Sequence, residues 1–268
     1  MSSACRSALF FLGLLCVTAA AQPRELRVCA DPDNLPLSHQ DGSGFENRIA
    51  RLVAEEMRAE LRYEWWPLRR GFVRKTMDAG LCDVFIGVPK DFERVMMTQP
   101  YYRSSYVFVD GRRASGIDHF DDPRLRSLRI GVQLVGNDLA ATPPGYALAM
   151  NGHIDNVRGF TIYGHGPVSQ RMVAALARGE LDAALIWGPQ AGYFVKQSAT
   201  PLELRLARSP ASLADLPFEF DIAMGVRRGD RALRDELDAI IDRRRADIDA
   251  ILAAYSVPRT DRSEREAR

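Results

Sequence analysis

The chain has 268 residues, of which 46% are hydrophobic and 26% are charged. With 12 Phe, 8 Tyr and 3 Trp, this composition is typical of a folded globular protein and excludes collagen-like, mucin-like, coiled-coil and wholly disordered chains. The 36 Lys and Arg residues nearly balance the 35 Asp and Glu residues, so the charge gives no indication of nucleic acid or an anionic membrane as a partner. No stretch reaches the roughly 18 apolar residues of a membrane span.

The N-terminal segment, residues 1–21, has the layout of a secretory signal peptide. Arg6 forms a short basic region, residues 9–17 are apolar, and three alanines at 19–21 offer a cleavage site. A buried N-terminal helix is the alternative, and a lipid anchor on Cys16 is disfavoured because a leucine precedes it. We therefore expect an exported, periplasmic chain that is formally neutral after cleavage.

Export leaves two cysteines in the mature chain, Cys29 and Cys82. In an oxidising compartment two remaining thiols are more often paired than free. A bridge would close a loop of 52 intervening residues and stabilise the fold by about 4 kcal/mol through chain entropy. A two-thiol metal site is the alternative, although no histidine lies near either cysteine in sequence.

The first half of the mature chain alternates strand and helix patterns. Apolar runs bounded by turn residues predict strands, and apolar residues at helical spacing predict helices. In chain order the expected elements are strand 26–30, helix 45–57, strand 61–65, helix 72–77 and strand 82–88. This βαβ series predicts an α/β lobe.

The second half repeats the same order of elements. A strand at 128–132 is followed by a helix at 168–176 that ends at Gly179, and Asp182 then opens an apolar strand. In the first half Asp83 likewise lies three residues after Gly80 and opens an apolar strand. Two matched helix–glycine–strand units predict two similar lobes rather than one long sheet.

Two further stretches, 100–109 and 218–226, read as hinge strands between the lobes. After them a long amphipathic helical region extends to Pro258. We expect a two-lobed α/β fold, each lobe a mixed sheet flanked by helices and the two joined by the hinge strands. The boundaries predicted are lobe 1 at 24–109 and 220–257, lobe 2 at 110–219, and a disordered charged tail at 258–268.

The order of these motifs over residues 24–257 resembles the type II periplasmic solute-binding proteins. Five longer runs resemble a narrower group within them, the binding-protein-like proteins associated with quinoprotein alcohol dehydrogenases (the MoxJ/XoxJ type): 29–36, 44–50, 66–74, 80–84 and 100–109. That resemblance implies a non-catalytic accessory protein without a cofactor. Its partner would be a quinoprotein methanol or alcohol dehydrogenase or the cytochrome c of that enzyme, and it would be monomeric on its own. Binding of a small molecule, pyrroloquinoline quinone (PQQ) included, stays open.

Departures from the amino-acid-binding relatives favour the narrower group. Those relatives hold the ligand carboxylate with an Arg and hydroxyl side chains just after the third strand. Here that strand ends in Gly87, Val88 and Pro89, which offer no hydroxyl, and Pro89 lacks an amide donor. The relatives hold the ligand amine with a carboxylate in the second lobe, and this position aligns with Trp187. A free amino acid is therefore not the expected ligand.

Polar side chains after the first strand are candidate cleft residues. Asp31, Asp33 and Asn34 follow that strand, and α/β proteins place ligands beyond the carboxyl ends of their strands. A turn in which the carboxylates cap backbone amides explains the same residues, so both interpretations stay open.

Aromatic and basic residues supply the other candidates for a ligand-binding or partner-binding cleft. Trp65 and Trp66 end the second strand, and Arg69 and Arg70 follow, a pairing of residue types that is typical of contact surfaces. One core Trp with solvated arginines is the alternative. The hinge region adds Tyr101, Tyr102 and Arg103, with Trp187 in the second lobe, although a packed aromatic connector would need the same residues.

The sequence gives little indication of catalysis or metal binding. His39, His119, His153 and His165 are scattered, and no nucleophile-elbow, zinc-protease or phosphate-loop motif occurs. We therefore expect no catalytic residue and no metal site. The competing hypothesis is a solute receptor that delivers a small non-amino-acid molecule to an ABC importer, and an enzyme that uses Asp31 is a minor third.

One geometric argument opposes the Cys29–Cys82 bridge. The first strand is expected beside the third, and if Ala30 pairs near Ile86, Cys29 lies opposite a residue three positions past Cys82. Such an offset separates the two Cα atoms by about 10 Å, beyond the roughly 7 Å that a disulfide spans. The bridge is still predicted, and it requires a staggered register or a bulge just before Cys82.

Overall fold

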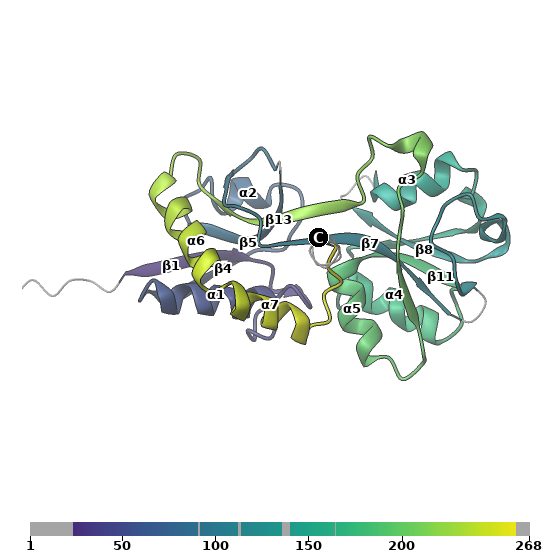
Figure 1. Cartoon of the computed structure of the whole chain (residues 1–268), viewed down its shortest axis with the longest axis horizontal. Coiled ribbons are helices and arrows are strands. Elements are labelled where there is room, and N and C mark those ends of the chain that lie inside the picture. Colours follow the sequence, from purple (N-terminus) through teal and green to yellow (C-terminus); the bar gives the residue numbers. More distant parts are fainter. Residues whose placement is uncertain (1–23, 91, 112–113, 136–139, 164, 261–268) are drawn as a thin grey trace, which may run out of the picture.

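The computed structural model describes residues 24–90, 92–111, 114–135, 140–163 and 165–260, which form two α/β lobes (Figure 1). The predicted signal peptide lies outside the described residues. Within the described part of the chain, no helix is both long enough and apolar enough to cross a membrane.

Lobe 1 is a sheet in the order β4-β1-β5-β13, in which the first three strands are parallel and β13 is antiparallel. Its helices pack around this sheet, and α1, α6 and α7 lie together along it in Figure 1. The elements are β1 (Glu25–Ala30), β2 (Asp33–Asn34), β3 (Ser38–His39), α1 (Phe45–Glu56), β4 (Glu60–Trp65), α2 (Phe72–Lys75), β5 (Val84–Pro89), β6 (Met96–Met97), β13 (Glu219–Val226), α6 (Arg231–Arg243) and α7 (Arg245–Ala254).

Lobe 2 repeats this arrangement in the order β10-β8-β11-β7, again three parallel strands and one antiparallel strand. The elements are β7 (Tyr102–Asp110), η2 (Pro123–Ser127), β8 (Ile130–Val135), β9 (Ala140–Ala141), α3 (Pro143–Met150), η3 (Ile154–Asn156), β10 (Val157–Thr161), α4 (Val168–Ala177), β11 (Ala183–Trp187), α5 (Gly188–Gln197), β12 (Glu203–Leu206) and η4 (Ala211–Leu213). The fold class predicted from the sequence is confirmed.

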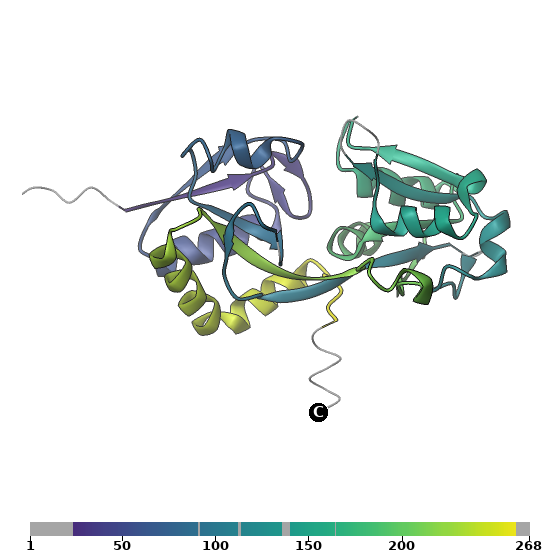
Figure 2. The ribbon, with the colours of Figure 1, turned by 90° about the horizontal axis from the view of Figure 1, so that it is seen from above.

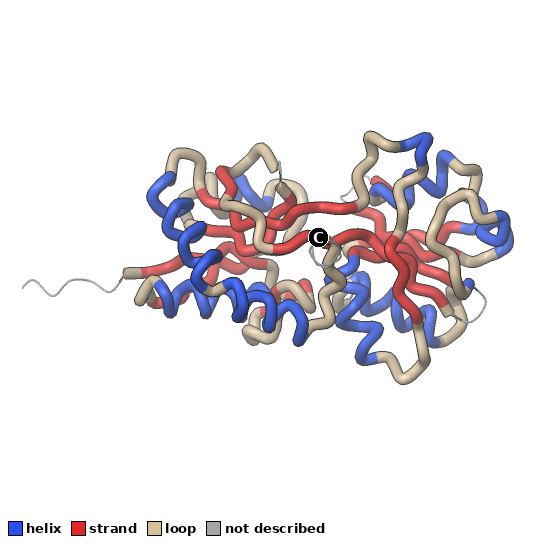
Figure 3. The backbone as a smooth tube through the Cα atoms, in the orientation of Figure 1, coloured by secondary structure: helices blue, strands red, loops and turns tan. Residues whose placement is uncertain are grey.

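Two long strands, β7 and β13, connect the lobes, as Figures 2 and 3 show. They pair with each other over residues 102–105 and 219–222. Beyond this segment β7 continues into the lobe 2 sheet beside β11, and β13 continues into the lobe 1 sheet beside β5. The hinge is therefore hydrogen-bonded to both sheets, and any closure of the lobes has to bend or twist this pair of strands.

The matched glycine–aspartate units perform the same task in both lobes. Asp83 accepts hydrogen bonds from the backbone N–H and the guanidinium of Arg27, at 2.6 to 3.2 Å. Asp182 accepts the equivalent bonds from Arg129, at 2.9 to 3.0 Å. Each carboxylate thus ties the entry of the third strand to the start of the first, which explains why the pattern occurs twice.

The predicted disulfide joins Cys29 and Cys82, whose Cα atoms lie 5.5 Å apart. The register assumed from the sequence is correct, because Val28 pairs with Val84. The objection was wrong because β5 begins at Val84, two residues later than predicted, so Cys82 is not part of the ladder. A turn at Gly80, with φ of +74°, brings Cys82 back against β1.

Lobe 2 has no disulfide at the position equivalent to the Cys29–Cys82 bridge. By the register of the paired strands, Gly131 and Leu181 occupy the positions of Cys29 and Cys82. A Cβ atom on Gly131 would lie only 2.6 Å from Leu181 Cδ1. A leucine side chain over a glycine therefore fills in lobe 2 the space that two sulfur atoms fill in lobe 1.

The C-terminal region differs from the prediction in two places. The long helical region is two helices, α6 and α7, separated at Arg244. The predicted disordered tail begins with three residues that are fixed against the hinge: Ser104 donates a hydrogen bond to the carbonyl of Pro258, and Thr260 donates its N–H to the carbonyl of Arg103. Residues 261–268 lie outside the described residues.

Candidate functional site

A cleft lies between the lobes, formed by four cavities of about 200 to 320 Å³ that share wall residues. Its walls come from the loop after β1, the start of α1, the end of β5 and the hinge strands on one side, and from lobe 2 on the other. Residues shared between neighbouring cavities are Asp31, Asp33, Asn34, Leu37, Glu46, Leu68, Gly87, Pro89, Tyr106, Ile162, Gly166 and Trp187.

Three aromatic side chains form the hinge end of the cleft. Trp187 lies edge-to-face against Tyr106, with ring centroids 5.3 Å apart, and against Phe220, with centroids 5.8 Å apart. Burial raises the pKa of the Tyr106 hydroxyl to about 12. Tyr102 lines the same cavity of about 280 Å³. The predicted candidates Tyr102 and Trp187 are thus brought together on one wall.

The Glu46 carboxylate lines the cleft beside these rings, although it was not a predicted site residue. It packs so closely on Gly87 that a Cβ there would lie 2.2 Å from Glu46 Oε1. Burial, with a smaller contribution from the charge of Asp31, raises the pKa of the Glu46 carboxyl to about 8. No described residue donates a hydrogen bond to this carboxylate or pairs with it as a cation.

Asp31 fits both interpretations of the sequence: it caps backbone amides, and it also lines the cleft. Its carboxylate accepts from the N–H of Asp33 at 2.8 Å and from the N–H of Leu68 at 2.5 Å. The second bond fixes the loop of residues 67–70, here named the rim loop, at the mouth of the cleft. Leu68, 55% exposed, and Arg69 line the mouth, and Arg70 next to them is exposed to solvent.

Asn34 forms a hydrogen bond that spans the two lobes. Its Oδ1 accepts from Gln190 Nε2, on α5 of lobe 2, at 3.2 Å. Asp33, beside it, is exposed and lines the outer part of the cleft. The polar candidates after β1 therefore sit where the lobes approach each other.

Besides Arg70, four of the predicted site residues line none of the four cleft cavities. Tyr101 is fully buried and donates its hydroxyl to the carbonyl of Ile86 at 2.9 Å. Trp65 stacks on Tyr63, with centroids 4.5 Å apart, and Trp66 is half-buried with the Lys75 ammonium 4.8 Å from its ring. These three side chains contribute packing rather than a cleft surface.

The fourth, Arg103, points away from the cleft. It contacts the carboxylates of Glu219 and Asp221 and lines a separate cavity of about 660 Å³. The alternation of a strand explains this, because Tyr102 and Tyr106 share one face of β7 and Arg103 is on the other.

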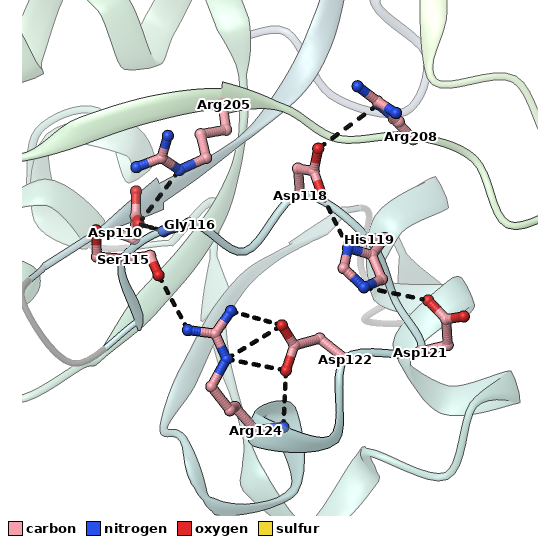
Figure 4. Close-up of polar contacts among 10 residues, drawn as sticks. All are labelled: Asp110, Ser115, Gly116, Asp118, His119, Asp121, Asp122, Arg124, Arg205 and Arg208. Carbon is pink, nitrogen blue, oxygen red and sulfur yellow. Dashed lines mark hydrogen bonds and ion pairs between the residues drawn. The ribbon is translucent and has the colours of Figure 1, made fainter.

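Figure 4 shows the polar network beside that second cavity. Asp118 accepts from the His119 ring at 2.8 Å and pairs with Arg208. Arg124 binds Asp122 through both its backbone and its guanidinium, which fixes the loop leading into η2. These bonds stabilise the loop before η2 internally and, through Arg208, join it to the segment that follows β12.

Three residues that line the cleft, Glu46, Phe220 and Ile222, were not predicted from the sequence, although the pattern of β13 indicates two of them. On β13, Phe220 and Ile222 alternate with Glu219 and Asp221, so the apolar pair faces the cleft with Tyr106. Glu46 follows the helix start at Phe45, but only the fold shows that Gly87 lies against it. In the described ranges, no three His, Cys, Asp or Glu side chains gather as metal ligands do.

Comparison with known proteins agrees with this architecture. The sequence profile of the family described as bacterial extracellular solute-binding proteins, family 3, matches residues 26–257. Protein MoxJ of Methylorubrum extorquens is 33% identical over 288 aligned positions, which cover 94% of this chain and 92% of that protein. The crystal structure of periplasmic binding protein XoxJ from Methylobacterium extorquens AM1 superimposes with a TM-score of 0.73 at 36% identity, covering 87% of this chain and 98% of that one. For MxaJ from Methlophaga aminisulfidivorans MPT the TM-score is 0.76 at 26% identity, with 87% and 99% covered.

The fold and its cleft define a two-lobed binding protein, and the chain belongs to the bacterial extracellular solute-binding proteins of family 3. Within that family it is of the MoxJ/XoxJ type, since the similarity to those proteins extends over nearly the whole chain. The resemblance drawn from the sequence motifs is thereby confirmed.

Proposed function

We propose that this chain is an exported, non-catalytic accessory protein that binds a quinoprotein alcohol dehydrogenase of the methanol dehydrogenase class and supports its assembly or activation in the periplasm. The observation that carries the proposal is the similarity to MoxJ over 94% of the chain. A quinoprotein methanol dehydrogenase from the same organism is the partner to test first, with the cytochrome c of that enzyme as the second.

The cleft supports a partner other than a free amino acid. By the sequence resemblance, Trp187 aligns with the position from which amino-acid-binding relatives present a carboxylate to the ligand amine. Trp187 and Pro89 both line the cleft, and Pro89, at the end of β5, offers no hydroxyl side chain. The rim loop exposes Leu68 directly before Arg69 and Arg70, a combination of apolar and arginine surface that is typical of protein contacts. We place the docking face for the dehydrogenase at this rim.

Co-purification and a deletion strain test the proposal together. The mature protein should retain the dehydrogenase on an affinity column, and a Leu68→Asp variant should retain much less. Deleting the gene should lower dehydrogenase activity without lowering the amount of its transcript. If the dehydrogenase passes through the column and its activity in the deletion strain is normal, the proposal is wrong.

The second candidate is a solute receptor for an ABC importer, with the chain closing on a small molecule. The Asn34–Gln190 bond favours it, because a hydrogen bond between the lobes stabilises a closed arrangement. A receptor should show a thermal shift with one solute and compaction in small-angle scattering. A scattering curve that no member of a broad metabolite panel changes would count against it.

A further inference from the structure

We propose that the hinge end of the cleft is a binding site for a small alkylated ammonium cation, held between the aromatic rings of Tyr106, Trp187 and Phe220 and the carboxylate of Glu46. The proposal goes beyond the accessory function and does not depend on it, because it concerns what the cavity binds whether or not a dehydrogenase docks outside.

The aromatic wall supplies the first half of the site. Three rings with centroid separations of 5.3, 5.8 and 6.5 Å meet edge-to-face, and all three residues line the same cavity. The faces of aromatic rings carry partial negative charge and attract cations, and walls of this kind are a known means of recognising quaternary ammonium groups. A cavity of about 280 Å³ suits a small ligand.

The carboxylate supplies the second half. Glu46 lines the same cavity and makes no hydrogen bond or ion pair within the described residues. The ionisable groups around it are Asp31 from the loop after β1, Tyr63 from β4, and Tyr101 and Tyr102 from the start of β7. Each of these is anionic or neutral, so the cavity repels an anion and favours a cation.

The same charges exclude the zwitterion of an amino acid. A ligand carboxylate would lie near Glu46 and Asp31, and Pro89 offers no N–H to bind it. A monocation that lacks a carboxylate meets neither obstacle. The aromatic corner also excludes strongly hydrated metal ions, because the rings cannot replace their water ligands.

A cation at this position is coupled to the ionisation of Glu46. Because the pKa of the Glu46 carboxyl is raised to about 8, most of the population is protonated at neutral pH, and the cation binds the ionised form. Affinity should therefore rise about tenfold per pH unit below pH 8 and level off above it. Between pH 6 and pH 9 the total gain is about 100-fold.

Titration calorimetry with tetramethylammonium chloride tests the site, since this cation does not titrate and any pH dependence belongs to the protein. The matched neutral probe is 2,2-dimethylpropane-1-ol, which has the same branched shape, and sodium chloride at equal ionic strength is the salt control. The cation should bind at least tenfold more tightly than the alcohol at pH 9, with the predicted rise from pH 6.

Two variants connect the result to the residues. Glu46→Gln should weaken cation binding at pH 9 at least tenfold and remove the pH dependence, whereas Glu55→Gln, exposed on the same helix, should change neither. Gly87→Ala should also weaken binding, because the added methyl displaces the Glu46 carboxylate. Equal affinity for alcohol and cation, or no cation binding at 50 mM at pH 9, would overturn the proposal and leave the dehydrogenase interaction unaffected.

Discussion

The disulfide offers a prediction whose size follows from the structure. Cys29 and Cys82 are separated by 53 positions, and the chain-entropy model gives about 4 kcal/mol for a closed loop of that length. Replacing both by alanine, in C29A/C82A, should lower the free energy of unfolding by that amount plus the cost of the cavity left by two buried sulfur atoms.

Lobe 2 supplies the matched variant. Its Gly131 and Leu181 fill the equivalent space without a bond, so C29G/C82L should lose the cross-link yet keep the packing. The cavity cost should then be recovered, and this variant should be the more stable of the two despite its extra glycine in a strand.

Urea denaturation at equilibrium, followed by tryptophan fluorescence, measures both differences. Thiol titration of the denatured, unreduced wild-type protein serves as the control and should find no free thiol in the mature chain. Two free thiols would refute the bridge. A C29G/C82L variant less stable than C29A/C82A would refute the equivalence of the two lobes at this position.

Four further predictions follow from the same structure. Asp182→Ala should cost about 2 to 3 kcal/mol in urea denaturation, because it leaves the Arg129 donors without their acceptor, whereas Glu180→Ala on the surface should leave the free energy of unfolding almost unchanged. The double variant G131C/L181C should form a second disulfide, visible as the absence of additional free thiols after denaturation. Because burial raises the pKa of Glu46 to about 8, the folded state binds more protons than the unfolded state between pH 4.5 and 8. The free energy of unfolding therefore falls as the pH rises through this window. Glu46→Gln should reduce this fall, so the variant should be more stable than wild type at pH 9 but not at pH 5. The hydrogen bond to Asp118, with the charge of Asp121, raises the pKa of His119. The NMR titration of the His119 ring should therefore be centred above pH 6.5 in wild type and at a lower pH in Asp118→Asn. The stability that protonated His119 contributes is present at low pH and is lost as the pH rises through the raised pKa.

Much of the fold could be predicted because local signals agree with the global arrangement. The helix at Phe45 has its apolar residues on one face, and the apolar strands carry the parallel sheet as expected. The repeated glycine–aspartate unit predicted two lobes correctly, because in each lobe an equivalent aspartate, Asp83 or Asp182, joins two strands. The start of β5 was placed two residues early because Cys82 is apolar and reads as strand, although the turn at Gly80 displaces it.

The site was predicted only in part, and the reason is physical. Asp31, Asn34, Tyr102 and Trp187 follow or belong to strand ends, a position that sequence can identify. Glu46 is recognisable only once Gly87 is seen beneath its carboxylate, a contact between positions far apart in the chain. Trp65 and Tyr101 line none of the cleft cavities, and sequence alone does not separate these cases because a residue type suited to binding is equally suited to a core.

We propose that this chain binds a quinoprotein methanol dehydrogenase at the rim of the cleft. Titration calorimetry of the mature, disulfide-bonded protein into the purified dehydrogenase tests it most directly, with Leu68→Asp as the variant and Glu55→Gln as the control. The account predicts a one-to-one complex with a dissociation constant below about 1 μM, equivalent to more than 8 kcal/mol, weakened at least tenfold by the rim variant and unchanged by the control. A titration that releases or absorbs no heat of binding at tens of micromolar protein, or a complex that Leu68→Asp leaves as tight as wild type, would contradict the proposal.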